Sequence, residues 1–475
     1  MAVSITTVAL LCLVFLLSAY LKRRTTKRPP LPPGPPADPF IGHLRIMPSD
    51  QQELVFHEWA KIYGDVMHLK VLGHDIIVLD SVQAATELLE KRSALYSDRP
   101  NFTVYTTMGW DHNVAFFPYG RRFRKHRKFL QSYLSQQFTA MFRPIQELNA
   151  RYLAKGLVEN TRDFKYYISR YTISVIMRIA YGHQILSDDD EFMPLVENVA
   201  YAQNNGGPPG GTVVDYFPIR MSISPLMITY THRRILSTTL PFVVPRDSLH
   251  NIRSGMEAEG TAERSFLRTQ MESVSGKDLT DEDIQDLKGS AGVLFAAGVD
   301  TTSSSLETFV LALLHHPDVQ KKGQQEFDRV IGDRLPTFED YDALPYVGRV
   351  TMEVLRGMNL DGNVYTKPTE FNPDRFLRKS EGGNEEPPPV ATFGFGRRIC
   401  PGRHLAATNI WIAVATIFAT VNITKAKDKD GNEITPEIIF ESGVTSRPKA
   451  FSCSITPRSE KMIRIVASEC KNLSM

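Results

Sequence analysis

The chain has 475 residues, of which 42% are hydrophobic and 23% are charged, and its formal net charge is +2. This composition supports a large folded core, and the small net charge excludes a broadly basic nucleic-acid-binding protein and a trap for acidic substrates. The four cysteines show no CxxC spacing, so neither a zinc site nor a disulfide framework is predicted and a reducing compartment is indicated.

The first 21 residues form an almost continuous apolar stretch that is long enough to span a bilayer as a helix. Positive residues follow it at Lys22, Arg23 and Arg24 and none precedes it, so the rest of the chain is expected in the cytosol. A cleaved signal peptide is the alternative, but the positive segment and cleavage site that it needs are missing. We predict a transmembrane signal-anchor helix at residues 1–21, a basic and proline-rich hinge at residues 22–36, and one folded body at residues 37–475.

Short elements are predicted in the first half of the body. A helix at residues 50–65 precedes two strands, at residues 66–71 and 75–80, joined by a hairpin-like turn. Residues 204–212 are a glycine- and proline-rich loop, and residues 220–251 fit no regular pattern. Helical periodicity dominates between these features, at residues 82–91, 120–134, 137–157, 164–181 and 190–203.

The longest helical pattern runs from Leu279 to His316, and it begins with Thr280 and Asp283 at the spacing of a capping box. At 1.5 Å per residue it would span roughly 54 Å, which crosses a whole domain. Residues 297–302 place a glycine beside an Asp–Thr pair, which favours a local opening of the helix. Burying these polar groups is costly, which indicates that they have a function. A solvated polar notch is the alternative.

Two further helices are predicted at residues 317–330 and 346–356. The second carries Glu353 and Arg356, which are three residues apart and therefore lie on one face. Arg375 follows in a proline-broken loop. An acid–arginine pair of this spacing is by itself most often a weak surface ion pair.

A single cysteine, Cys400, stands in the stretch Phe393-Gly-Phe-Gly-Arg-Arg-Ile-Cys-Pro-Gly402, just before an apolar helix predicted at residues 403–420. The glycines allow tight turns and close approach to a flat ligand, and turned amides with the helix N-terminus can hold a thiolate charge. Cys400 is therefore a candidate metal ligand or nucleophile, and a buried structural thiol is the alternative. Residues 422–466 alternate in places, which predicts antiparallel strands.

Together these segments resemble the cytochrome P-450 family of haem-thiolate monooxygenases, in its microsomal fungal form. Residues 297–302 fit the oxygen-activating helix segment of that family. The family's haem-binding pattern and structural triad are matched at Phe393, Gly396, Arg398, Cys400 and Gly402, and at Glu353, Arg356 and Arg375. The resemblance implies a cytochrome P-450 fold (α+β), mainly α with a small β portion, with residues 37–475 as the haem-thiolate catalytic domain. It also implies a single-pass anchor in the endoplasmic reticulum with this domain in the cytosol.

The resemblance further implies roles for individual residues. Cys400 would be the axial ligand of the iron of haem b, and Arg398 and Arg127 would pair with the haem propionates. Asp300 and Thr301 would relay protons during catalysis. Substrate contacts are implied at Phe295, Ala297, Gly298, Val444 and Thr445. Electrons from NADPH would arrive through NADPH-cytochrome P-450 reductase, and one oxygen atom of O₂ would enter a lipophilic small molecule of secondary metabolism.

The basic run at residues 121–128 allows three interpretations. Arg127 would face a propionate, the other cations could dock the acidic reductase, or most of the run could be a solvated helix face. Nucleic-acid binding is disfavoured, because aromatic residues are not interleaved and the chain as a whole is not basic. Phe123 stands where the family usually has tryptophan, so it can stack but cannot donate a hydrogen bond.

The chain departs from the family after Arg356. Only 14 residues, 357–370, separate the predicted helix from the loop that carries Arg375, where the family has a much longer segment. An internal deletion of this kind would remove strands that pair with the small sheet and would open the haem pocket. Two hypotheses follow, an active monooxygenase and a non-catalytic or degenerate membrane-anchored haem protein. An isomerase or dehydratase that needs no O₂ is a third, which the Asp300–Thr301 pair disfavours.

Overall fold

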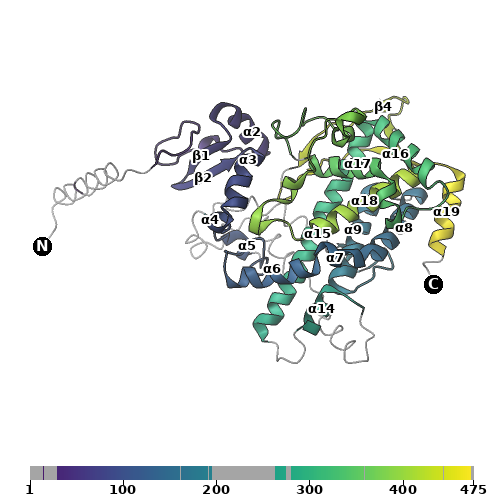
Figure 1. Cartoon of the computed structure of the whole chain (residues 1–475), viewed down its shortest axis with the longest axis horizontal. Helices are drawn as coiled ribbons and strands as arrows, with labels where there is room; N and C mark the ends of the chain where they lie inside the picture. Colours follow the sequence, from purple (N-terminus) through teal and green to yellow (C-terminus); the bar gives the residue numbers. More distant parts are fainter. Residues whose placement is uncertain are drawn as a thin grey trace. The chain divides into compact units, whose positions relative to one another are not determined.

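The computed structural model in Figure 1 describes most of the chain after residue 28. The described part includes only residue 14 of the predicted anchor. It does not include the loop at residues 204–212, the unassigned residues 220–251 or most of the helix predicted at residues 190–203. Within the described part, no helix has the length and apolarity of a membrane span. The described residues are 14, 29–107, 109–160, 162–190, 192–194, 215, 263–273, 280–357, 359–441 and 443–471.

The chain divides into two compact units, Met1–Asp80 and Ser81–Met475. The first contains the short 3₁₀ helix η1 (Leu44–Ile46), helix α2 (Gln52–Tyr63) and the antiparallel strands β1 (Val66–Val71) and β2 (His74–Leu79). Inward side chains alternate along β1, so that Met67, Leu69 and Val71 are buried. The predicted hairpin is confirmed, and in the described residues its sheet has these two strands alone.

The second unit consists mainly of helices (Figure 1). Its α-helices are α3 (Val82–Ala85), α4 (Ser93–Tyr96), α5 (Thr103–Thr107), α6 (Arg121–Tyr133), α7 (Gln136–Thr139), α8 (Arg143–Glu159), α9 (Phe164–Tyr181), α14 (Phe266–Ser273), α15 (Asp281–His315), α16 (Pro317–Val330), α17 (Pro345–Arg356), α18 (Arg403–Thr420) and α19 (Glu460–Lys471). Short helical turns are η2 (Thr86–Lys91), η3 (Ala140–Phe142), η6 (Phe338–Ala343), η7 (Pro373–Phe376), η8 (Lys379–Glu381), η9 (Val390–Phe393) and η10 (Gly396–Arg398).

Helix α15 runs through the core of this unit and packs against α9, α18 and α6. It begins with the predicted capping box, in which Thr280 and Asp283 bond each other's backbone N–H groups. Close packing elsewhere depends on small residues, since a Cβ added to Gly156 of α8 would lie 2.2 Å from the Tyr167 ring of α9. The longest helix of the chain is thus held on several sides.

The small β portion of the second unit comes from the tail. Strands β4 (Glu433–Ile434), β3 (Val421–Lys427) and β7 (Cys453–Pro457) form one antiparallel sheet in that order, and β5 (Phe440–Glu441) pairs with β6 (Arg447–Pro448) in another. A fold that is mainly α with a small β portion is therefore confirmed.

Local differences from the predicted elements have physical causes. The helix predicted at residues 137–157 is split into α7, η3 and α8, because Pro144 opens α8 at a first-turn position. The tail does not end in strands, since α19 forms a helix whose buried residues Met462, Val466 and Cys470 recur every four positions. These side chains pack with Phe327 and other apolar residues in a satellite core.

Candidate functional site

Cys400 lies in a loop whose backbone is fixed on both sides. Its N–H donates to the carbonyl of Phe393 at 2.7 Å, and helix α18 begins three residues later. Gly394 and Gly396 have φ values of +77° and +53°, which favour glycine. A Cβ on Gly396 would also lie 2.1 Å from the Leu89 carbonyl oxygen, so only glycine fits there. The loop therefore presents the half-buried thiol in one defined place.

The surroundings of the Cys400 thiol decide between nucleophile and ligand. Burial raises its pKa, although the N–H of Gly402 and the nearby guanidinium of Arg127 act in the opposite direction. A thiol with a raised pKa is a poor free nucleophile at neutral pH. A bound metal cation deprotonates a coordinating thiol outright, so this environment suits a metal ligand better.

The middle of α15 exposes one face, although most of this helix is buried. Ala297 and Thr301 are exposed and Gly298 and Ser305 are half-buried, while Val299, Asp300 and Thr302 are buried. The exposed residues are spaced four apart, so they share one side of the helix. An accessible stripe on an otherwise buried helix leaves a surface against which a flat ligand could lie.

The predicted opening of α15 at residues 297–302 is wrong, because the helix is continuous there. The threonine hydroxyls do bond backbone carbonyls as expected, from Thr301 to Ala297 and from Thr302 to Gly298, each at 2.8 Å. These bonds follow the existing turns of the helix and do not replace its ladder.

Two of the predicted substrate residues point away from the exposed face. Phe295 is buried, with its ring 6.5 Å from that of Tyr181 on α9. The missing side chain of Gly298 faces α9 as well, since a Cβ there would lie 2.8 Å from the Ile176 side chain. Gly298 therefore serves the packing of α15 on α9, whereas Ala297 does lie on the accessible face.

The predicted tail contacts, Val444 and Thr445, lie in the turn that precedes β6. Val444 is exposed, and the turn is attached to α15 because Ser304 Oγ donates to the Ser446 carbonyl at 2.6 Å. The structure thus joins this turn to α15 within the second unit.

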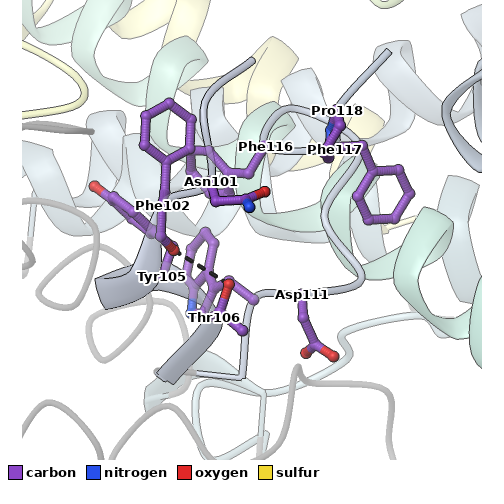
Figure 2. Close-up of a pocket in the computed structure, with 9 residues that line it drawn as sticks. Asn101, Phe102, Tyr105, Thr106, Asp111, Phe116, Phe117 and Pro118 are labelled. Atoms are coloured by element: carbon purple, nitrogen blue, oxygen red, sulfur yellow. Dashed lines mark hydrogen bonds between the residues drawn. The ribbon is translucent and has the colours of Figure 1, made fainter. Parts of the chain in front are cut away.

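Aromatic side chains from the segment before α6 surround a small cavity of about 90 Å³. Figure 2 shows Phe102, Tyr105 and Phe116 lining it. The rings of Tyr105 and Phe116 stack at 4.3 Å, and Ala296 of α15 packs against the same cluster. This cluster of aromatic side chains therefore lies beside α15.

Two arginines flank the Cys400 loop. Arg127 of α6 is buried and donates to the Ile399 carbonyl, while its Nε has no hydrogen-bond partner in the described residues. Arg398 donates to the Phe117 carbonyl at 2.7 Å and lies 3.9 Å from the centre of the Phe123 ring. Phe123 therefore provides the stacking surface expected of it.

Desolvation lowers the pKa of both guanidiniums, to about 10 for Arg398. Among the described residues neither arginine forms a salt bridge with a carboxylate within 4.0 Å. Partly buried cations without a close carboxylate favour a bound anionic group, and guanidinium matches carboxylate geometry. Cys400, Arg127 and Arg398 thus fit a flat cofactor that carries carboxylates and a metal.

Several cations of the basic run in α6 form ion pairs within the fold. Asp286 of α15 is fully buried and accepts from Arg122 at 2.9 Å and from Lys125 at 2.7 Å. His126 Nε2 lies 2.9 Å from the same carboxylate. The simple solvated face is therefore wrong for this half of the run. Other cations line an open pocket of about 510 Å³, namely Arg124, Arg127, Lys128 and Arg397.

Glu353, Arg356 and Arg375 form a fully buried ion cluster and are not a surface pair. Arg356 Nη2 lies 2.7 Å from Glu353 Oε1, and Arg375 Nε lies 3.1 Å from Glu353 Oε2. Arg375 also contacts Glu386 at 2.8 Å, which the sequence pattern did not reveal. The predicted triad is brought together and has a fourth member.

The short connection after Arg356 is packed onto this cluster. Arg356 donates to the carbonyl of Pro368 at 2.7 Å, and Tyr365 is buried. Asp361 accepts from the N–H of Val82 at 2.7 Å, at the start of α3. The chain therefore closes across the short segment without breaking the ion cluster.

Comparison with known proteins identifies the family. The cytochrome P-450 family profile matches residues 32–360 and 357–453. The chain belongs to the cytochrome P-450 family. It is accordingly an oxidoreductase of the monooxygenase class that uses haem, O₂ and reducing equivalents from a redox partner to act on a small molecule. A mere relic is not favoured, since the ion cluster and the Cys400 loop are both formed.

Fungal cytochrome P-450 proteins align with nearly the whole chain. Cytochrome P-450 monooxygenase 136 of Postia placenta is 34% identical over 96% of this chain and 93% of its own. Monooxygenase claR of Ampulloclitocybe clavipes is 32% identical over 99% of this chain and 94% of its own. Monooxygenase ple1 of Rhodocybe pseudopiperita is 30% identical over 95% of this chain and 94% of its own.

These alignments also bear on the predicted deletion. The match to Postia placenta spans 509 positions, which exceeds the 475 residues of this P-450 chain, so the chain lacks residues that its relative has. The two matched parts of the family profile meet at residues 357–360. A deletion immediately after Arg356 accounts for both observations.

The structure adds residues that the sequence pattern missed. Arg447 of β6 lies 3.1 Å from Asp300 and also approaches Glu307, which is fully buried. Glu307 could have been noticed, because it follows Asp300 by seven positions and so shares its side of α15. No local pattern marked Arg447, since its partners lie about 140 residues away.

Proposed function

We propose that Cys400 is the axial thiolate ligand of haem b in this P-450. The carrying observation is the half-buried thiol in its glycine-shaped loop, flanked by two arginines without close carboxylates. Phe393, Gly396 and Gly402 would shape the loop around the ligand. Arg127 and Arg398 would hold the propionates. When bound, haem with a thiolate ligand supplies the O–O cleavage chemistry.

The accessible face of α15 would border the reaction site. Thr301 holds a hydroxyl on this face, and Asp300, the next residue, holds a buried carboxylate. In this proposal the Thr301 hydroxyl would release its bond to the Ala297 carbonyl and donate toward the reacting oxygen, and Asp300 would supply protons to Thr301. Ala297 and the apolar segment near Tyr105 would exclude water and orient a lipophilic substrate, with Val444 and Thr445 closing the other side.

Electrons would come from NADPH through NADPH-cytochrome P-450 reductase. The support for this partner is the cationic pocket lined by Arg124, Arg127 and Lys128 of α6 and by Arg397 of η10. An acidic protein would be steered to such a surface. We further propose anchoring through residues 1–21 in the endoplasmic reticulum, with the catalytic domain cytosolic, and a role in secondary metabolism.

The decisive experiment is a carbon monoxide difference spectrum of the full chain reduced with dithionite. We expect the red-shifted Soret band of a thiolate-ligated haem, because Cys400 supplies the ligand. The Cys400→Ser variant should lose this band, whereas Cys453→Ser, a matched change elsewhere in the second unit, should keep it. A wild-type band typical of a neutral axial ligand would refute the assignment.

A further inference from the structure

One arginine joins two buried acids on the long helix. Arg447 Nη2 lies 3.1 Å from Asp300 Oδ1, and Arg447 Nε lies 3.6 Å from Glu307 Oε1. Asp300 is 4% exposed and Glu307 is 1% exposed. The acids are seven residues apart, about two helical turns, so they lie on one side of α15. Residues from two distant parts of the chain thus form a compact charged group.

The contacts of this group are incomplete. Asp300 Oδ2, Glu307 Oε2 and Arg447 Nε are buried and make no hydrogen bond to any described residue. Buried polar atoms normally have partners, and leaving them without one is costly. Glu307 lies 3.6 Å from Arg447 Nε and 3.8 Å from Lys165 Nζ. These distances are too long for direct hydrogen bonds and suit bridging by water.

The group extends from the interior to solvent. Lys165 of α9 faces Glu307, and its side chain is 26% exposed. Burial raises the pKa of Glu307, and Asp300 and Asp163 act in the same direction, while Arg447 and Lys165 oppose them. Glu307 therefore keeps its proton to a higher pH than an exposed glutamate would. A buried acid with a raised pKa that lies between solvent and Asp300 can both release and regain a proton.

A purely structural role explains the group less well. The turn before β6 is already attached to α15 by the bond from Ser304 to the Ser446 carbonyl. A second attachment through two acids and one arginine would be redundant, and a buried ion group is by itself weak evidence for a stabilising role, because replacing a whole buried pair by apolar residues is often neutral for stability. The unpartnered oxygens are what a proton path requires.

We propose that Glu307 is the outer proton-holding group of a relay to Asp300, and that Arg447 is the positioning residue that holds both acids in line. The proposal rests on the role of Asp300 and Thr301 given above. In each step the Glu307 carboxyl passes a proton through bridging water to the Asp300 carboxylate and then takes one from solvent beside Lys165. No charge accumulates, because each proton that leaves is replaced.

The first test reads the protonation of Glu307 without turnover. Infrared spectra of the full-length protein should show a carbonyl stretching band of a buried neutral carboxyl that shrinks as pH rises and shifts in D₂O. Glu307→Gln should abolish this band. Glu326→Gln is the control, because Glu326 of α16 is also buried but accepts the backbone N–H groups of Tyr346 and Val347 at the start of α17. A titrating band that survives in Glu307→Gln would overturn the proposal.

The second test measures proton supply during turnover without added substrate. NADPH oxidation and H₂O₂ release with a P-450 reductase should fall about tenfold in Glu307→Gln, and the wild-type pH dependence should flatten. Arg447→Lys should retain more of the rate than Arg447→Gln, since it keeps the charge. An unchanged pH profile in Glu307→Gln, with an intact carbon monoxide band, would refute the relay. If the wild-type thiolate band is missing, the proposed function fails and the infrared band still decides the protonation of Glu307.

Discussion

Glu353 holds two buried guanidiniums together, so neutralising it should cost a large share of the stability. It accepts from Arg356 at 2.9 and 2.7 Å, from Arg375 at 3.1 Å and from the N–H of Asn372 at 2.9 Å. Glu353→Gln keeps the shape of the side chain but leaves two buried cations with less negative charge. Breaking a buried ion pair in this way costs about 3–5 kcal/mol.

Urea unfolding followed by circular dichroism measures this loss directly, and in thermal unfolding it corresponds to roughly 4–6 °C for a domain of this size. The matched control is Glu87→Gln, which makes the same chemical change in an exposed carboxylate that pairs with Lys91 and Arg92. Exposed pairs contribute less than about 1 kcal/mol, so this variant should resemble wild type. Equal stability of Glu353→Gln and Glu87→Gln would refute the assignment of Glu353 as the centre of the cluster.

Two further predictions concern the loop and the α6–α15 contact. Gly396→Ala should lower haem incorporation severalfold at unchanged helix content. The φ of Gly396 is +53°, and an added Cβ would lie 2.1 Å from the Leu89 carbonyl oxygen, so there is no room for it. Full haem content in the pyridine haemochrome assay would contradict this prediction. Asp286→Asn should cost about 2 kcal/mol at pH 7. Burial works against the ionised form of Asp286, but Lys125, His126 and Arg122 outweigh it and hold its pKa well below the usual range. The contribution of the ionised Asp286 carboxylate to the free energy of unfolding is therefore present above the unfolded pKa of about 4 and is lost as pH falls below that value. A difference between wild type and Asp286→Asn in urea unfolding that stays constant down to pH 3 would contradict the ion pairing.

Much of the fold and of the site could be predicted from local patterns in the sequence. The helices α9 and α18 were predicted with their observed ends, because an unbroken apolar periodicity and clear flanking signals define them. The Cys400 loop was recognisable because its glycines are required by the backbone itself. The deletion after Arg356 was visible too, because the resemblance implies a longer spacing between these motifs than the chain has.

Tertiary structure decided what depends on distant partners. The ion cluster of Glu353 was recognisable only by resemblance, since burial rather than spacing distinguishes it from a surface pair. The direction of Gly298 and Phe295 toward α9 followed from helix packing, which periodicity does not specify. Arg447 gained its place beside Asp300 because a tail hairpin folds back onto α15. Sequence thus determined the elements and the motifs of this P-450, whereas long-range packing determined which polar groups share one buried environment.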